Sequence, residues 1–186
     1  EGATVMDVPS PPCAATEQEL VAAASRGDHA AFETLITEHK TLVWAVCLRV
    51  TGNQHDAEDA LQETLLAAWR GIGSFRGRSR FGTWLYRIAS NAALHQARRR
   101  RDVPTDIQDH RVVAAEFTQS LGDADLVQRA LRQVPEDFRV ALVLFELCDF
   151  TYAEIADHQG VGVQTVKSRL SRARQALTVA IHAMSD

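Results

Sequence analysis

The sequence predicts an all-α protein with two small helical domains joined by a linker, the second containing a helix-turn-helix. Apolar residues recur at steps of three and four, and no alternating run long enough for a sheet stands out. Ala, Leu, Val and Arg are abundant, which favours helix. This periodicity lapses over residues 102–122, which contain Pro104 and Gly122. We interpret that stretch as a linker between domains at 16–101 and 123–182.

The first domain is expected to begin after a tail over residues 1–15, where clustered prolines oppose regular structure. Thr16 and Glu19 have the spacing of a capping box and predict a short helix. Asp28 is suited to cap a second helix, which Gly52 would end. The apolar stripe of that second helix is Phe32, Leu35, Ile36, Leu42, Val43, Val46 and Val50.

A third helix is predicted from Asp56, with Leu61, Leu65 and Trp69 facing inward at spacing four. Its other side carries acidic and amide residues: Asp56, Glu58, Asp59, Gln62 and Glu63. Acidic residues in a first turn also suit the helix dipole. No nucleophile or metal ligand accompanies them, so we expect a solvated, partner-facing surface rather than acid–base catalysis.

Residues 71–101 combine a glycine-bearing loop with eight arginines and no acidic residue. The glycines match neither a dinucleotide-binding nor a Walker loop, so nucleotide binding is not expected. Aromatic rings interleaved with arginine favour single-stranded DNA, because arginine neutralises phosphate and rings accept unstacked bases. The loop carries five such residues: Phe75, Arg76, Arg78, Arg80 and Phe81. The alternative is structural, since most single Phe and Trp residues lie in cores and the run Arg98–Arg101 complements a helix dipole.

The helix after this loop is expected to bury an apolar stripe made by Phe81, Leu85, Ile88 and Ala92. Other residues then lie on or near its remaining faces, among them Trp84, Arg87 and Asn91.

The second domain ends in two helical patterns separated by a turn with Gly160 and Gly162. The stripe of the last helix is Val163, Val166, Leu170, Ala173 and Leu177. Its opposite face holds short donors and cations: Gln164, Thr165, Lys167, Ser168, Ser171, Arg172 and Gln175. Such a face suits a DNA major groove, because short residues let the backbone approach while Lys and Arg reach bases and phosphates. The alternative is an ordinary helical hairpin with a solvated basic face. Two helices before it, starting at Asp123 or Asp125 and at Pro135, would buttress the motif.

Charge is segregated along the 186 residues although the net charge is only −4. Residues 1–70 and 102–159 carry net charges of −7 and −8, whereas residues 71–101 and 160–186 carry +8 and +3. Alternating blocks of this kind indicate that a nucleic-acid surface and a protein-partner surface coexist.

Three cysteines, Cys13, Cys47 and Cys148, form no CxxC pair, and seven histidines show no metal-ligand spacing. We therefore expect no metal, no cofactor and a reducing cytoplasmic location. No apolar run approaches the roughly 18 residues of a membrane span, so no direct membrane insertion is expected. The N-terminus lacks a charged start followed by an apolar core, so we expect no secretory signal.

With these motifs placed, the chain resembles a bacterial RNA polymerase sigma factor of the extracytoplasmic-function (ECF) class over about residues 17–182. Four segments carry the resemblance in the family's order. Residues 56–70 resemble the polymerase-binding helix, 74–94 the segment that melts and reads the −10 element, 131–147 the start of the C-terminal domain, and 151–177 the −35-reading helix-turn-helix.

The resemblance implies roles for the residues already singled out. The acidic face of the third helix would meet the basic clamp helices of the largest polymerase subunit, and the flap of the second-largest subunit is a further expected contact. Loop Phe75–Phe81 with Asn91 would hold a base flipped from the −10 element, with Trp84 and Arg87 nearby. Readers of the −35 groove would be Lys167, Ser168, Ser171 and Arg172, with Gln164 a further candidate. Three residues are expected at phosphates or in packing: Thr165, Arg169 and Arg174.

Two residues depart from the family pattern. Gly82 replaces a bulkier residue early in the −10 helix and predicts a looser helix start, and Gln164 stands where Gly is frequent. The family is usually held in check by an anti-sigma protein, which we expect here too. A stand-alone helix-turn-helix regulator with a partner- or ligand-sensing N-terminal domain is the main rival, but it leaves residues 71–101 unexplained. A small helical enzyme and a protein-binding adaptor are the others.

Overall fold

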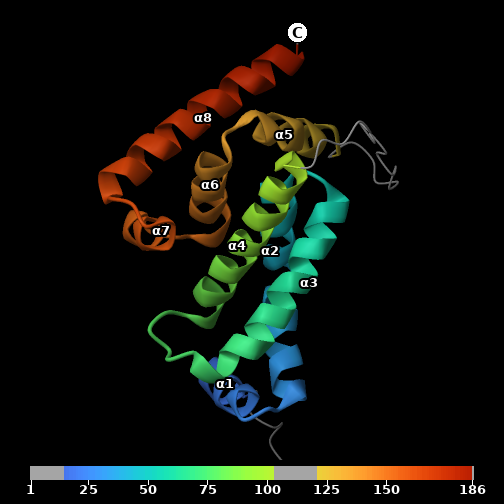
Figure 1. The fold of residues 1–186 in the computed structure, drawn as a ribbon, viewed down its shortest axis with the longest axis vertical. Helices are drawn as coiled ribbons and strands as arrows, with labels where there is room; N and C mark the ends of the chain where they lie inside the picture. Colours follow the sequence, from blue (N-terminus) through green and yellow to red (C-terminus); the bar gives the residue numbers. More distant parts are fainter. Residues whose placement is uncertain (1–14, 103–120, 186) are drawn as a thin grey trace, which may run out of the picture.

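A computed structural model describes residues 15–102 and 121–185, and all regular structure within these ranges is helical (Figure 1). The predicted tail, apart from Ala15, and most of the predicted linker lie outside the described residues. No helix in the described ranges is both long and apolar enough to cross a membrane.

The first domain has four α-helices and one 3₁₀ turn: α1 Glu17–Ser25, α2 His29–Thr51, α3 Gln54–Gly71, η1 Ile72–Ser74 and α4 Phe81–Asp102. The capping box of Thr16 and Glu19 forms as predicted, and Asp28 accepts hydrogen bonds from two backbone N–H groups of α2. Gly52 ends α2 in the left-handed region, at φ 86°. The third helix begins at Gln54 rather than at Asp56, because the side chain of Asn53 caps it.

Small residues of α3 make its closest packing against α2 and α4, so the fully buried face of this helix lies beside the predicted stripe rather than on it. The buried residues of α3 are Ala57, Ala60, Thr64 and Ala68. They bring the helices close together and leave the larger Leu61, Leu65 and Trp69 only half-buried at the edge. Trp69 stacks on His29 with ring centroids 4.2 Å apart.

The second domain comprises α5 Leu121–Gln133, α6 Glu136–Cys148, α7 Tyr152–Gln159 and α8 Val163–Ser185. Helix α5 begins at Leu121, before the predicted Asp123 or Asp125, and Pro135 is the N-cap of α6 rather than part of its first turn. Helix α8 packs across α5, α6 and α7, with Val166, Leu170 and Ala173 buried.

The two domains pack against each other through α6, which contacts both α2 and α4 (Figure 1). Arg139 of α6 is buried at 6% exposure and joins the domains. Its Nη1 donates to the carbonyl of Val50 at 2.7 Å, and its Nη2 donates to the carbonyls of Val134 at 3.0 Å and Arg132 at 3.2 Å. These carbonyls lie at the C-terminal ends of α2 and α5, where they lack intrahelical partners and a cation is favourable. Burial is the main reason that the pKa of Arg139 lies below its ordinary value.

Candidate nucleic-acid and partner interfaces

Helices α7 and α8 form the predicted helix-turn-helix. Thr151 and Glu154 make a capping box at the start of α7. Gly160 ends α7 with φ 64° and ψ 35°, a conformation that glycine adopts without strain. The N–H of Val161 donates to the carbonyl of Ala156 at 3.0 Å and completes the turn.

The solvent side of α8 carries six of the predicted −35 residues, all exposed: Gln164, Thr165, Lys167, Ser168, Ser171 and Arg172. Among the described residues, neither Lys167 nor Arg172 has an acidic partner. Lys167 Nζ lies 5.8 Å from the ring centroid of Tyr152, which steadies its stem. This surface therefore presents hydrogen-bonding groups and positive charge on a rigid helix.

Arg169 and Arg174 lie in intramolecular contacts, one of the two alternatives left by the sequence. Arg169 Nη1 donates to Gln159 Oε1 at 2.8 Å, and its guanidinium lies 6.0 Å from the Phe138 ring centroid. Arg174 forms an ion pair with Glu146 at 2.8 Å. Both side chains brace α8 against α6 and α7.

Three aromatic rings meet where the arginine-rich loop enters α4. Phe75 lies 5.1 Å from Trp84 and 6.1 Å from Phe81 between ring centroids. The expectation that Phe81 faces DNA needs correction, because its ring is 0% exposed and belongs to the core. Its N–H donates to Glu17 Oε1 at 3.3 Å, which ties α1 to the start of α4.

Around these rings the loop leaves Arg76, Arg78 and Arg80 exposed, while Phe75 and Trp84 are half-buried. Gly82 does not loosen the helix start as expected. A Cβ at this position would lie 2.8 Å from His39 Cε1 and 3.3 Å from Tyr86 Cε2. Glycine therefore permits close packing of α4 on α2, and His39 Nδ1 lies 2.8 Å from Tyr86 Oη in a hydrogen bond.

Further along α4, Asn91 is exposed whereas Arg87 is engaged by the second domain. Arg87 Nη1 lies 2.8 Å from Asp157 Oδ2, and Ser90 Oγ lies 2.9 Å from His158 Nε2. Burial, with the nearby positive charge of Arg87, lowers the pKa of His158. No sequence pattern indicates this contact, because it joins residues about seventy positions apart.

The acidic face of α3 divides into exposed and engaged residues. Glu58, Asp59 and Gln62 are exposed. Asp56 is 15% exposed in its side chain and forms an ion pair with Arg100 at 3.2 Å. Glu63 accepts a hydrogen bond from Gln96 Nε2 at 3.2 Å, so these two acids stabilise the packing of α3 on α4.

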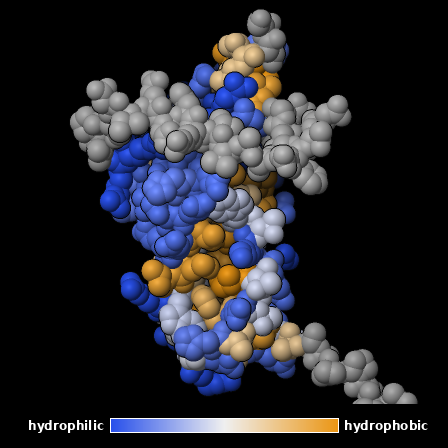
Figure 2. Space-filling model, turned by 90° about the vertical axis from the view of Figure 1, so that its right-hand side faces the viewer, coloured by the Kyte–Doolittle hydropathy of each residue, from blue (hydrophilic) through white to orange (hydrophobic). Residues whose placement is uncertain are grey.

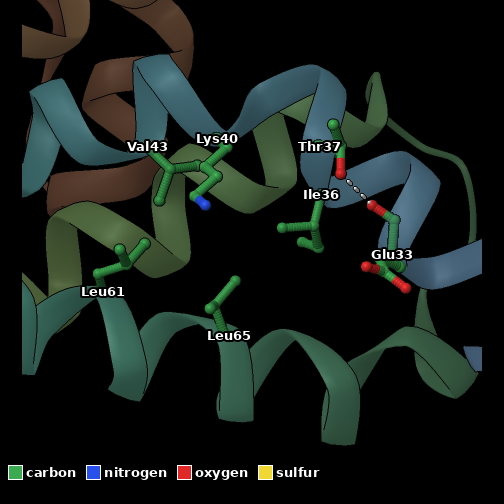
Figure 3. Close-up of a pocket in the computed structure, with 7 residues that line it drawn as sticks. All are labelled: Glu33, Ile36, Thr37, Lys40, Val43, Leu61 and Leu65. Carbon is green, nitrogen blue, oxygen red and sulfur yellow. Dashed lines mark hydrogen bonds between the residues drawn. The ribbon is translucent and has the colours of Figure 1, made fainter.

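A groove runs beside this acidic face, between α2 and α3, where apolar side chains lie together with Glu33, Thr37 and Lys40 of α2, and sequence reasoning missed it. Figure 3 shows Leu61 and Leu65 of α3 pointing toward Ile36 and Val43 of α2, around a cavity of about 160 Å³. Leu66, next along α3, is 56% exposed. Apolar surface gathers on the side of the molecule that carries α3 (Figure 2). The half-buried leucines at spacing four were the available signal.

Within the described residues no group of three or more His, Cys, Asp or Glu side chains forms a candidate metal site. The chemistry offered by these surfaces is binding, through positive charge and aromatic rings on α4 and α8 and through acidic and apolar groups on α3.

Comparison with known families identifies the class of protein. Residues 35–103 match sigma-70 region 2, and residues 124–177 match sigma-70 region 4. The chain therefore belongs to the sigma-70 family of RNA polymerase sigma factors, and its role is that of a transcription initiation factor.

Several relatives belong to the extracytoplasmic-function class, which confirms the resemblance seen in the sequence. The chain is 37% identical to the ECF sigma factor SigM of Mycobacterium tuberculosis, over 87% of this chain and 83% of the relative. It is 31% identical to the ECF sigma factor SigW of Bacillus subtilis, over 82% of this chain and 89% of that one. It is 35% identical to the RNA polymerase sigma-H factor of Pseudomonas aeruginosa, over 89% of this chain and 93% of that relative. A stand-alone helix-turn-helix regulator is not favoured.

Two solved structures share the fold. Sigma factor RpoE, in a complex with the anti-sigma factor NepR from Bartonella quintana, has a TM-score of 0.68 at 27% identity and covers 81% of this chain and 96% of its own. CnrH, solved with the cytosolic domain of CnrY, has a TM-score of 0.67 at 23% identity and covers 90% of this chain and 97% of its own.

Proposed function

We propose that this chain binds core RNA polymerase through α3 and directs it to promoters by reading −35 duplex DNA with α8 and capturing a −10 base beside α4. The observation that carries the proposal is the exposed, basic and hydrogen-bonding face of α8 opposite its buried stripe. That face occurs in a chain whose other domain belongs to sigma region 2.

At the −35 element, α8 would lie in the major groove with its N-terminal half against the bases. Lys167 and Arg172 have the reach and charge for guanine O6 and N7, whereas Ser168 and Ser171 are short enough to permit close approach. Gln164 suits an adenine edge, and Thr165 suits a phosphate.

At the −10 element, the exposed arginines of the loop would neutralise the backbone of the separated strand. Extruding a base costs a few kcal/mol, which stacking and hydrogen bonds in a protein pocket offset. Phe75 and Trp84 have partly accessible rings for stacking, and Asn91 has an exposed amide for base-edge hydrogen bonds. Phe81 contributes by supporting these rings from the core.

For polymerase binding, Glu58, Asp59 and Gln62 would surround an apolar centre at Leu61, Leu65 and Leu66. An apolar core with a polar rim is the usual anatomy of a protein interface. The rim is acidic, which complements the basic clamp helices of the largest subunit. The flap of the second-largest subunit is proposed to contact the C-terminal domain, and the polymerase performs the covalent chemistry.

An anti-sigma protein is proposed as the third partner. The support is the similarity to RpoE, whose solved structure contains an anti-sigma factor. Co-purification from the native host tests this proposal, and a chain recovered only free or with polymerase would count against it.

The proposed function is tested by transcription with core polymerase on a library of randomised promoters. Active templates should share two motifs separated by about two helical turns. Leu66→Asp, which places a charge at the centre of the proposed clamp surface, should abolish polymerase binding while leaving the helical fold intact. Arg129→Ala, on an exposed face of α5, is the matched control. A library without enriched motifs would reject the proposal.

A further inference from the structure

Gln159, the last residue of α7, bridges the two helices that flank α7 in the second domain. Its Nε2 donates to the backbone carbonyl of Asp137 in α6 at 2.8 Å, and its Oε1 accepts from Arg169 Nη1 of α8 at 2.8 Å. A carbonyl only accepts and a guanidinium only donates, so these two neighbours together fix the orientation of the amide. One side chain thus ties the first turn of α6 to α8.

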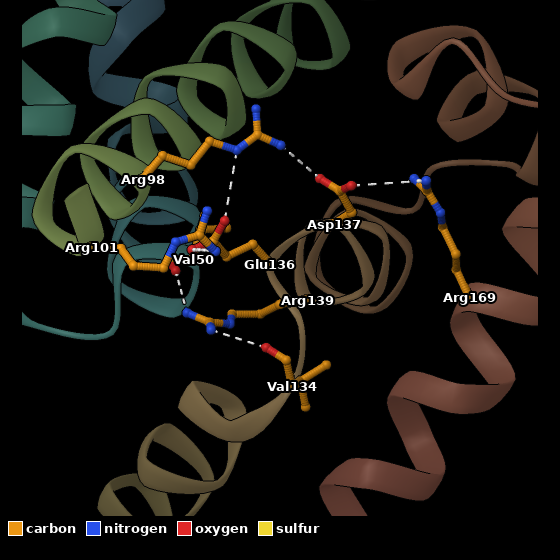
Figure 4. Close-up of polar contacts among 8 residues, drawn as sticks. All are labelled: Val50, Arg98, Arg101, Val134, Glu136, Asp137, Arg139 and Arg169. Carbon is orange, nitrogen blue, oxygen red and sulfur yellow. Dashed lines mark hydrogen bonds and ion pairs between the residues drawn. The ribbon is translucent and has the colours of Figure 1, made fainter.

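The guanidinium of Arg169 is held by α6 as well as by α7. Its Nη2 lies 3.8 Å from Asp137 Oδ2, and its Cζ lies 6.0 Å from the ring centroid of Phe138. Figure 4 shows Asp137 between two arginines, with Arg169 of α8 on one side and Arg98 of α4 on the other. The Arg169 side chain is only 18% exposed, so it serves the packing of α8 rather than a DNA phosphate.

The remaining contacts at the start of α8 constrain its direction less. The buried stripe of α8 contributes apolar burial, which is favourable but non-directional. In the turn, a Cβ added at Gly160 or Gly162 would meet nothing within 4 Å, so no other element packs tightly on this connection. Hydrogen bonds depend on angle as well as distance, so the link between Gln159 and Arg169 is suited to fix the tilt of α8.

The proposed base readers lie on both sides of Arg169 along α8. Ser168 precedes it directly, Ser171 follows two residues later, and Gln164 lies five residues before it. Five residues of α-helix span about 7.5 Å, so a tilt of about 10° centred on Arg169 moves Gln164 by about 1.3 Å. N–H···O hydrogen bonds keep their donor–acceptor distance within a range of about 0.5 Å, so this movement is enough to disrupt contacts with base edges.

We propose that Gln159 is a positioning residue for −35 recognition: it fixes Arg169 against α6 and thereby sets the angle at which α8 meets the major groove. Its amide is occupied by protein groups on both sides, so it reads no base itself. The inference rests on the proposed function, because it names a further determinant of specificity for the same α8 surface. Base preference at the −35 element then depends on a residue outside that surface.

Three substitutions separate positioning from packing. Gln159→Met keeps the length of the side chain and removes both hydrogen bonds. Gln159→Glu keeps an acceptor for the Arg169 guanidinium, and the ionised carboxylate makes that bond charge-assisted, but it loses the donor to Asp137. Gln133→Met makes the same change from amide to thioether at an exposed residue that ends α5, and it is the matched control. Each variant is combined with core polymerase.

Initiation is measured on an active promoter from the randomised library and on derivatives with one −35 base pair exchanged. Gln159→Met should reduce the ratio between matched and exchanged templates by about threefold to tenfold, part of the discrimination typical of one base pair. Gln159→Glu should retain the ratio to within about twofold, because Arg169 keeps its partner. Gln133→Met should leave the ratio unchanged. An equal fall in initiation on every template, which loss of packing alone would cause, overturns the proposal, as does a ratio that Gln159→Met leaves unchanged.

Amide hydrogen exchange of the free chain tests the same link without DNA or polymerase. The backbone amides of residues 160–170 should exchange about fivefold faster in Gln159→Met than in Gln133→Met, since two hydrogen bonds that restrain α8 are lost. Equal exchange in these two variants rejects the positioning role. If instead the unsubstituted chain shows no −35 base preference, the proposed function fails, and the exchange result still decides whether Gln159 holds α8.

Discussion

Replacing Arg139 with methionine tests how the two domains are held together. The guanidinium donates three hydrogen bonds to carbonyls that end α2 and α5, at Val50, Val134 and Arg132. Methionine has a similar length and no polar group, so it fills the space but leaves those carbonyls without this donor.

Two opposing effects determine how far Arg139→Met lowers the free energy of unfolding. Hydrogen bonds to a charged group contribute about 1.5–3 kcal/mol each, and removing one partner of a buried set is costly. The cost of burying the guanidinium offsets part of the stabilisation from these hydrogen bonds, and Nε of Arg139 lacks a partner in the described structure. We therefore expect Arg139→Met to lower the free energy of unfolding by about 2–4 kcal/mol.

Two spectroscopic signals distinguish unfolding of the first domain from unfolding of the whole chain in urea. All three tryptophans, Trp44, Trp69 and Trp84, lie in α2, α3 and α4, so fluorescence follows the first domain. Far-ultraviolet circular dichroism follows all helices. The two transitions should coincide in the unsubstituted chain, whereas in Arg139→Met part of the dichroism should be lost at lower urea than the fluorescence.

A control and a contrary outcome make the experiment decisive. Arg129→Met removes only an exposed pair with Asp125 within α5, and we expect a change of at most about 0.5 kcal/mol. If Arg139→Met changes stability no more than Arg129→Met does, and its transitions still coincide, the account of Arg139 as the bond between domains is wrong.

Four further outcomes are expected. Lys167→Ala should weaken initiation by about 1–3 kcal/mol and relax preference at one −35 base pair, scored by transcription from promoter variants; unchanged preference would remove its role in readout. Asn91→Ala should reduce discrimination at one −10 position without weakening binding to polymerase, and equal discrimination would refute the assignment. Gly82→Ala should destabilise the first domain by about 1–3 kcal/mol in fluorescence-monitored unfolding, because the new Cβ meets the rings of His39 and Tyr86. His158 of α7 lies against Ser90 of α4, and its pKa is below the ordinary 6.5 while the two domains pack together. A chain whose domains separate binds a proton at His158 more readily, so the domain contact should be favoured above about pH 6.5 and weaken below it. Small-angle scattering should detect this weakening as an expansion, which His158→Gln should abolish.

Most of the local structure could be predicted from the sequence because local chemistry determines it. The capping box at Thr16, the cap at Asp28, the stop at Gly52 and the turn at Gly160 each depend on residues within one or two helical turns. The buried stripe of α8 at Val166, Leu170 and Ala173 follows in the same way from apolar spacing, whereas Val163, predicted to belong to it, is 42% exposed.

Sequence patterns fail for residues whose partners are distant along the chain. They place Phe81 both in the DNA-binding loop and in an inner stripe, and only its packing against Phe75 and Trp84 shows that it belongs to the core. Gly82 gave no hint that His39 lies within reach of a Cβ. Periodicity selects a face of a helix but not the neighbour that covers it, so neither the groove between α2 and α3 nor Arg139 as an interdomain residue could be foreseen.

We propose that this chain enables polymerase to open promoter DNA at a chosen place. Permanganate reactivity of thymines on an active promoter measures that opening directly. We expect reactive thymines in a short window at the −10 element only when the chain and core polymerase are both present. Reactivity with polymerase alone, or none with both proteins bound, would contradict the account.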